Sequence, residues 1–331
     1  MTTARKPLVN LDPVDGVTIT TLVDNSSDMF LVDQGPAKRP HQAPSARVRA
    51  STMEGGETND VFVAEHGFSA MVSVTRAGRE RRMLFDSGVS PDGMIENMRR
   101  LELSPKDFEA IVLSHGHFDH TGGLDGLIRA IGQVNLPVTI HPEFWNRRRI
   151  TIPGREPREI PTTSKAALRG AGFEIIEERQ PSFLFDRCLL VTGEVERTTG
   201  YEPGFPPQQQ YKEGQWIPDP LVLDDQAIVL HLRNRGLVVM TGCGHAGIVN
   251  IVRYARKLTG IDHVYAVIGG FHLGGPLFEP IIPAVIQALT ELAPEVIVPA
   301  HCTGWRAIHA LDAAFPDAFI PNSVGTRYEM A

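Results

Sequence analysis

One short segment constrains this chain more than any other. Residues 113–124 read LSHGHFDHTGGL, which places His115, His117, Asp119 and His120 close together directly after an apolar run. Imidazole nitrogen and carboxylate oxygen are common zinc ligands, and a catalytic zinc site needs about three protein ligands plus water. Four local donors exceed the needs of one such site. The segment therefore predicts a metal site on a loop, with donors for one or two ions.

Three more histidines follow apolar runs in the last third of the chain. The predicted strands LVVM, VYAVI and EVIVP run into His245, His272 and His301, and a helix is predicted after each. A single histidine at a strand end is usually a solvated loop residue, but six of the 12 histidines share this setting. We therefore add these three to the predicted metal site. The remaining histidines are interpreted as surface or structural residues: His41, His66, His231, His263 and His309. His141 is interpreted as structural, with a place in the wall of the site or behind its ligands as the alternative.

The order of predicted elements indicates an α/β protein. Strands are predicted at VTITTLVDN, FSAMVSVT, RRMLFDSG and FEAIVLS, and helices at MIENMRRLEL and LDGLIRAIG. The histidine-rich segment lies between FEAIVLS and LDGLIRAIG, on the kind of strand-to-helix loop where α/β proteins place chemistry. Two stretches rich in proline, glycine and polar residues, 34–60 and 195–220, predict long inserted loops.

Composition excludes several classes of protein. The 331 residues suffice for one large domain, 1–331, with insertions, and 42% apolar with 21% charged residues is typical of a globular protein. A net charge of -7 gives no electrostatic reason to expect nucleic acid or an anionic membrane as partner. Three cysteines are too few for a disulfide framework. With no predicted signal peptide or membrane span, we expect a cytoplasmic protein.

HGHFDH resembles the HxHxDH signature of the metallo-β-lactamase fold superfamily, and the order of strand, motif, helix and later single histidines is similar over nearly the whole chain. The resemblance implies a four-layered αββα sandwich, an α/β (α+β) fold in which helices cover two mixed sheets. It places the metal site at the sheet edge. We expect residues 34–60 and 195–220 to cap this edge.

The resemblance also assigns the donors to two metal ions. The first ion would be held by His115, His117 and His245, and the second by Asp119, His120 and His301. Asp86, in LFDSG, resembles the buried aspartate that supports this loop in the superfamily. Ligation rich in imidazole favours zinc, with iron, manganese and nickel as alternatives.

One departure from the superfamily pattern concerns the bridging aspartate of its dinuclear members. At the position expected for that residue the chain has Gly269 and Gly270, with His272 close behind. We expect His272 to be a ligand or to contact the metal-bound species directly. We expect Cys243 and Cys302, which lie beside His245 and His301, to be buried packing residues.

A finer resemblance is to 7,8-dihydropterin-6-methyl-4-(β-D-ribofuranosyl)aminobenzene-5′-phosphate synthase-like proteins. It rests on LVDN, LSHGHFDHTGGL, TGEVERTT, TGCGHAGI, IGGFHL, PAHCTG and SVGT. This subgroup implies transfer of a phosphoribosyl group onto an aromatic amine. The superfamily implies hydrolysis, in which a metal-activated hydroxide, oriented by Asp119, attacks a phosphoester, lactone or other ester.

We expect a small anionic molecule as substrate, with Glu194, Arg197 and Tyr201 supplying a carboxylate, a guanidinium and a stacking ring for its recognition. A solvated loop with a local ion pair is the competing interpretation of these three residues. An iron redox enzyme and a non-catalytic metal-binding sensor of the same fold are the other classes considered. A homo-oligomer is also possible.

Overall fold

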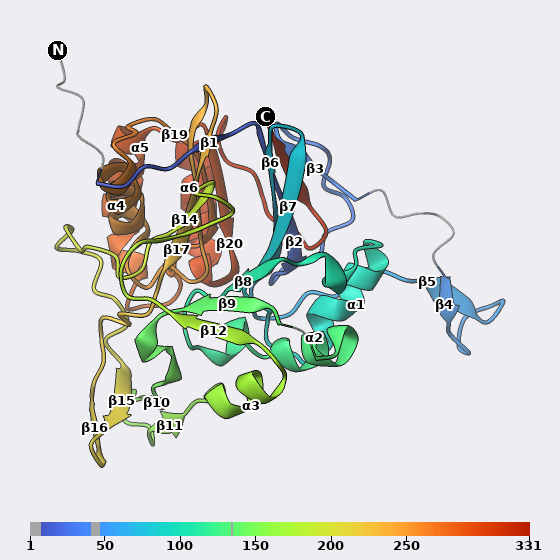
Figure 1. Cartoon of the computed structure of the whole chain (residues 1–331), viewed down its shortest axis with the longest axis horizontal. Coiled ribbons are helices and arrows are strands. Elements are labelled where there is room, and N and C mark those ends of the chain that lie inside the picture. Colours follow the sequence, from blue (N-terminus) through green and yellow to red (C-terminus); the bar gives the residue numbers. More distant parts are fainter. Residues whose placement is uncertain (1–7, 41–46, 134) are drawn as a thin grey trace.

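The computed structural model describes residues 8–40, 47–133 and 135–331, and its strands form two large facing sheets (Figure 1). The eight-stranded sheet consists of β2 (Gly16–Val23), β3 (Ala37–Lys38), β6 (Ser69–Arg76), β7 (Arg79–Phe85), β8 (Ala110–Val112), β9 (Pro137–Ile140), β12 (Glu174–Glu177) and β21 (Arg327–Met330). Its strand order is β12-β9-β8-β7-β6-β2-β21-β3. The sheet is mixed, since β7, β8, β9 and β12 run parallel and the other pairs antiparallel.

The second large sheet has seven strands and carries the C-terminal half of the chain. It consists of β1 (Pro13–Val14), β13 (Ser182–Leu184), β14 (Leu189–Val191), β17 (Ala227–Leu232), β18 (Gly236–Thr241), β19 (Val264–Gly270) and β20 (Val296–Ala300). The order is β13-β14-β17-β18-β19-β20, with β1 beside β17. Because β18, β19 and β20 are parallel, their carboxyl ends lie at one edge of the sheet.

Helices cover the outer face of each sheet. They are α1 (Gly93–Arg100), α2 (Leu124–Ile131), α3 (Lys165–Gly170), α4 (Ile248–Thr259), α5 (Ile282–Leu292) and α6 (Trp305–Ala314). The first three share an apolar core with the eight-stranded sheet, and the last three share one with the seven-stranded sheet. A third core lies between the two sheets. These three cores separate four layers, so the predicted αββα sandwich is confirmed.

The alternation of side chains along single strands explains this layering. On β8, Ile111 packs in the core under α1 and α2, while Val112 packs between the sheets. On β19, Val267 faces the helices and Ile268 faces the other sheet. Successive side chains on a strand point to opposite faces, so a strand that is buried on both faces is apolar throughout.

Both stretches predicted as inserted loops contain short strands. Residues 34–60 include β3 and the hairpin of β4 (Arg47–Arg49) and β5 (Glu57–Asn59), which projects outward beside α1 in Figure 1. Residues 195–220 include β15 (Gln208–Lys212) and β16 (Gln215–Pro218), which extend a small sheet with β10 (Arg148–Ile150) and β11 (Arg158–Glu159). That 34–60 caps the site stays a prediction. The single domain over 1–331 also stays a prediction. Residues 1–7, 41–46 and 134 lie outside the described residues, and His41 is one of them.

None of the helices in the described part of the chain combines the length and the apolar character of a membrane span.

Candidate metal centre

The predicted histidines meet where strands of both sheets end. His115 follows β8, while His245, His272 and His301 follow β18, β19 and β20. The loops can approach closely because one of them carries Gly242, where a Cβ atom would lie 2.2 Å from the Ser114 hydroxyl oxygen. The two sheets therefore contribute ring nitrogens to one compact cluster.

Within this cluster, His115, His117 and His245 form a first donor set. Nε2 of His115 lies 2.9 Å from Nδ1 of His117, and Nε2 of His245 lies 3.2 Å from the same Nδ1 atom. Nitrogens bound tetrahedrally at about 2.0–2.1 Å from one zinc ion stand about 3.3 Å apart. The three buried rings thus have the spacing that a shared metal ion requires.

The protonation state of this first set also fits a metal ion. Burial, reinforced by the Arg148 charge, lowers the pKa of His117 to about 4. Burial and the neighbouring histidines hold the pKa values of His115 and His245 well below the ordinary value. All three rings are therefore neutral at pH 7, and a metal ion would not have to displace protons from them.

Neighbouring side chains determine which nitrogen of the His117 and His115 rings faces the cluster. Gln208 donates through Nε2 to Asp219, so its Oε1 atom, 2.5 Å from Nε2 of His117, accepts the His117 proton. The Ser114 hydroxyl donates to Asp86 and therefore accepts from Nδ1 of His115 at 2.9 Å. These contacts leave the lone pairs of His117 Nδ1 and His115 Nε2 directed at each other.

Asp119, His120 and His301 form a second donor set beside the first. Oδ2 of Asp119 lies 3.2 Å from Nε2 of His301 and 3.7 Å from Nε2 of His120. Burial raises the pKa of Asp119, but the positive charge of His120 and the hydrogen bond and charge of His301 outweigh it and lower that pKa. Asp119 is therefore ionised at neutral pH.

Asp86 supports both donor sets from behind. Its carboxylate lies 2.7 Å from Nδ1 of His120 and accepts from the backbone N–H and hydroxyl of Ser114, each at 2.7 Å. Burial lowers the pKa of His120, but Asp86 and Asp119 outweigh burial and raise it to about 9. Asp86 thus contacts His120 in the second donor set and Ser114 beside the first, and its support of bound metal stays a prediction.

Cys243 has a larger part in the cluster than the sequence indicated. It is buried, as expected, whereas Cys302 is only half-buried, and the Cys243 sulfur lies 3.1 Å from Nε2 of His120. This sulfur stands within metal-ligating distance of the second donor set and also of a group made by His245 and His272. Burial raises the pKa of Cys243, so it is a thiol in the metal-free protein and would have to lose its proton to act as a soft ligand that favours zinc.

His272 reaches the cluster through the ring of His245, and the two ring centroids lie 4.2 Å apart. Its Nδ1 atom is buried without a hydrogen-bond partner. His272 has a φ of 45°, and His301 and Asp86 have φ values of 49° and 55°. Non-glycine residues in this left-handed region carry strain, which is common where a structure holds side chains for function.

The residues predicted to bind substrate have partners of their own. Glu194 contacts His141 at 3.2 Å and pairs with Arg179, and Tyr201 packs beside the core under α4 and α5. Arg197 donates to the backbone oxygen of His245 at 3.1 Å. The structure thus brings Arg197 to a loop of the cluster, whereas the contacts of Glu194 and Tyr201 lie elsewhere. That these three bind substrate stays a prediction.

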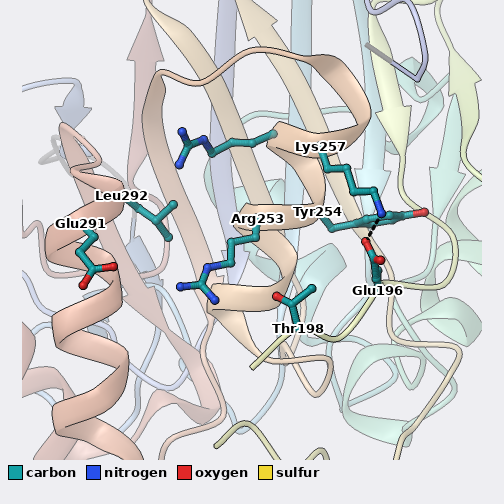
Figure 2. Close-up of a pocket in the computed structure, with 8 residues that line it drawn as sticks. Glu196, Thr198, Arg253, Tyr254, Lys257, Glu291 and Leu292 are labelled. Carbon is teal, nitrogen blue, oxygen red and sulfur yellow. Dashed lines mark hydrogen bonds and ion pairs between the residues drawn. The ribbon is translucent and has the colours of Figure 1, made fainter. Parts of the chain in front are cut away.

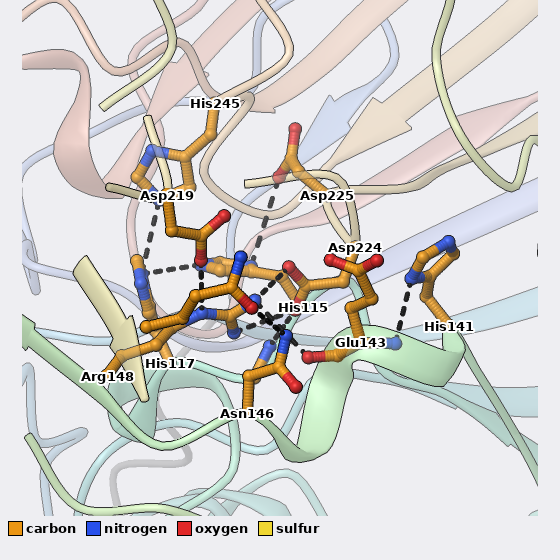
Figure 3. A network of polar contacts seen from close by, with 12 residues as sticks. His115, His117, His141, Glu143, Asn146, Arg148, Asp219, Asp224, Asp225 and His245 are labelled. Carbon is orange, nitrogen blue, oxygen red and sulfur yellow. Dashed lines mark hydrogen bonds and ion pairs between the residues drawn. The ribbon is translucent and has the colours of Figure 1, made fainter. Parts of the chain in front are cut away.

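A buried ion-pair network, which the sequence did not indicate, supports the first set (Figure 3). Arg148 is 1% exposed and pairs with Asp219 at 3.1 Å and with both oxygens of Asp224. Asp224 also accepts from the backbone N–H of Gly116, which lies between His115 and His117. Its neighbour Asp225 accepts from the N–H of Ala246, next to His245. The adjacent acidic pair thus ties two metal-site loops together.

The LVDN motif supports His301 from the eight-stranded sheet. Asp24 accepts the backbone N–H of His301 at 2.7 Å, and the Asn25 side chain donates to the backbone oxygen of His301 at 2.9 Å. The same region contains His66, whose sequence context predicts a surface or structural residue. His66 is exposed, but its ring contacts His301 and Asp119. The sequence offered no signal for this, because His66 does not end an apolar run.

Phe205, from the predicted loop 195–220, packs over the first set. Its ring lies 5.5 Å from the His245 ring and 5.3 Å from the His272 ring.

A separate pocket of about 640 Å³ lies along α4 and α5, where Arg253, Lys257 and Glu196 contribute to its wall (Figure 2). The residues that line this pocket lie outside the histidine cluster, so the volume of a pocket does not by itself identify the metal site.

Comparison with known proteins agrees with this architecture. The family model described as "Metallo-beta-lactamase superfamily" matches residues 67–301. A protein of Methanocaldococcus jannaschii, 7,8-dihydropterin-6-methyl-4-(beta-D-ribofuranosyl)-aminobenzene-5'-phosphate synthase, is 33% identical over 266 residues, which cover 79% of this chain and 88% of that protein. The uncharacterized protein MJ0448 of the same organism is 33% identical over 255 residues, covering 76% and 88%.

A solved structure has the same fold. It is that of Tm1679, described as a metal-dependent hydrolase of the beta-lactamase superfamily. The two chains superpose with a TM-score of 0.68 at 24% identity, over 95% of this chain and 99% of the other.

Proposed function

This chain belongs to the metallo-β-lactamase superfamily, and we propose that it is a metal-dependent hydrolase acting on a phosphoester, lactone or other ester of a small anionic molecule. The observation that carries the proposal is the pair of facing donor sets, one of three neutral imidazoles and one containing the ionised Asp119. We propose that His115, His117 and His245 hold one ion, and that Asp119, His120 and His301 hold the other.

Bound divalent metal ions supply a water of lowered pKa and an electrophile for the substrate oxygen. Three imidazoles around one point, with the sulfur of Cys243 beside His120, favour zinc over the harder magnesium and calcium. His272 adjoins the first set and is proposed as a further ligand or as a contact to the reacting group.

The chain's own residues set the conditions for the reaction. Asp119 is ionised and borders both His120 and His301, so its carboxylate can orient a water by accepting a hydrogen bond from it. Phe205 covers His245 and His272 and excludes water from that side. Gln208 and Asp86 hold the histidine rings in the orientation that the reaction needs.

A second candidate is phosphoribosyl transfer to an aromatic amine. It is favoured by the 33% identity to the methanogen synthase, whose name describes a ribofuranosyl-aminobenzene phosphate product. The same donor sets would then bind the diphosphate of the donor substrate. The two candidates differ in the acceptor, which is water in one and an amine in the other.

One experiment separates these candidates. Protein purified without chelator is incubated with a panel of phosphoesters and lactones, and separately with a phosphoribosyl diphosphate with and without an aromatic amine. Hydrolysis predicts turnover of panel members without amine, and incorporation of oxygen from labelled water. Turnover that requires the amine would establish transfer. Activity that survives complete metal removal would contradict both candidates.

A further inference from the structure

His66 occupies a defined position at the mouth of the second donor set. The backbone on both sides of it is attached to the loop that carries Asp119 and to the turn after β7. Phe68 donates its N–H to the Asp119 backbone oxygen at 3.2 Å, and the Glu65 carboxylate accepts from the N–H groups of Val89 and Ser90 at 3.1 Å each. The position of His66 is therefore fixed relative to Asp119.

Gly67 makes this attachment possible. A Cβ atom at this position would lie 2.8 Å from the backbone oxygen of Asp119 and 2.9 Å from the backbone nitrogen of Val89. Only a residue without a side chain lets the segment approach so closely. The His66 backbone consequently lies one residue from direct contact with the metal-site loop.

The His66 side chain lies between solvent and the second donor set. Its Nε2 atom is 3.8 Å from Oδ2 of Asp119, and its ring centroid is 4.9 Å from that of His301. The side chain is 67% exposed, whereas those of Asp119 and His301 are 12% and 0% exposed. At 3.8 Å the imidazole is too far from Asp119 for a hydrogen bond. Its Nε2 atom is therefore available to form a hydrogen bond with a molecule that enters from solvent.

The charge of the metal-loaded centre predicts the charge of the molecule that binds there. Two divalent ions would carry about four positive charges, and Asp119 is the one carboxylate in the two donor sets. Such a centre attracts an anion. Arg197, the cation predicted for substrate recognition, already donates to backbone oxygens of His245 and Leu221.

We propose that His66 is a substrate-binding residue that donates a hydrogen bond from its imidazole to an anionic oxygen, phosphate or carboxylate, of a substrate held at the second donor set. This assignment rests on the proposed function, because it requires the metal centre. It adds a recognition group beside His301 and Asp119, whereas Phe205 covers His245 and His272.

The test compares His66→Ala, His66→Gln and a matched control, His309→Ala, which removes another exposed histidine from α6. Metal content is measured by elemental analysis, and inorganic phosphate is titrated calorimetrically into each zinc-loaded protein. We expect unchanged metal content and about tenfold weaker phosphate binding in His66→Ala, which is the loss of one hydrogen bond to a charged group. We expect partial recovery in His66→Gln and no change in His309→Ala.

The possible outcomes separate the role of His66 from the anionic substrate class and from the proposed metal-dependent function. Phosphate affinity within about twofold of the parent in His66→Ala, with metal retained, would overturn the role of His66. Loss of metal in that variant would make His66 a ligand and would overturn it equally. A parent protein that holds metal without binding phosphate would contradict the anionic substrate class, and the His66 role with it. A parent that holds no metal would refute the proposed function itself.

Discussion

The Nε2 atom of His117 lies 2.5 Å from the Oε1 atom of Gln208, on a strand 91 residues further along the chain. This contact holds the His117 proton on Nε2 and so directs the lone pair of Nδ1 at His115 and His245. Gln208 in turn donates to Asp219, a partner of Arg148. The orientation of a proposed metal ligand thus depends on a buried network that contributes no donor to either set.

Gln208→Leu removes the acceptor for His117 while retaining most of the side-chain volume. We expect metal affinity to fall by about 10-fold to 100-fold, the usual cost of losing a group that orients a metal ligand. Competition with a chromogenic chelator measures this change. Gln209→Leu is the control, because the Gln209 side chain pairs with Arg149 instead. Equal affinities in the two variants would show that Gln208 does not orient His117.

Arg148 is expected to be needed for folding. Arg148→Met leaves Asp219 and Asp224 buried without their counter-charge, which costs about 3–5 kcal/mol in the free energy of unfolding. Arg147→Met, one residue away, removes a solvent-exposed pair with Glu159 and should cost about 1 kcal/mol or less. Urea unfolding of the metal-free proteins gives both values. Similar losses in the two variants would contradict the role of this network.

The raised pKa of His120 predicts how pH acts on the metal-free protein and on metal binding. Its pKa of about 9 in the folded state exceeds the unfolded value of about 6.5, so its ion pairs stabilise the fold fully below pH 6.5. This contribution is lost as pH rises from about 6.5 to 9, and over this range the melting temperature of the metal-free protein should fall. Metal affinity should rise over the same range, because a ligand nitrogen must give up its proton.

Asp86→Asn tests the cause of this pH dependence. It removes the negative charge beside Nδ1 of His120, and the pKa of His120 should move back toward its ordinary value. Calorimetric titration with zinc between pH 6 and 9 should then show a flatter affinity profile than in the parent. An unchanged profile would mean that another group takes up the proton.

His272→Ala tests the departure from the superfamily pattern. If His272 is a ligand, we expect metal content or turnover to fall as it does on loss of a ligand, well beyond the effect of a surface change. His263→Ala, which removes an exposed histidine paired with Glu295, is the control. Unchanged metal content and unchanged turnover on a phosphoester panel would identify His272 as a structural loop residue.

The parts of the fold that could be predicted are those specified by local pattern. Continuous apolar runs such as those of β8 and β19 identify strands that are buried on both faces, and His115 and His272 follow closely after them. The spacing within HGHFDH likewise brings four donors together without help from distant residues. The same local pattern added the histidines that follow β18 and β20, and the resemblance to a known family assigned them to the two ions.

The parts that could not be predicted depend on contacts between distant polar residues. The hairpin of β15 and β16 is short and polar, and its one signal is the turn at Glu213 and Gly214, both at positive φ. Gln208 and Arg148 meet the site through this small sheet, which has no apolar periodicity. His66 reaches the site because Gly67 allows a close backbone approach, and periodicity does not reveal such approaches.

Elemental analysis of protein purified without chelators tests the central claim most directly. Two facing donor sets predict about two divalent metal ions per chain, with zinc the main element. His115→Ala should lose about one of these ions, and so should His301→Ala. Metal content well below one ion per chain in a protein that still turns over its substrate would contradict the account.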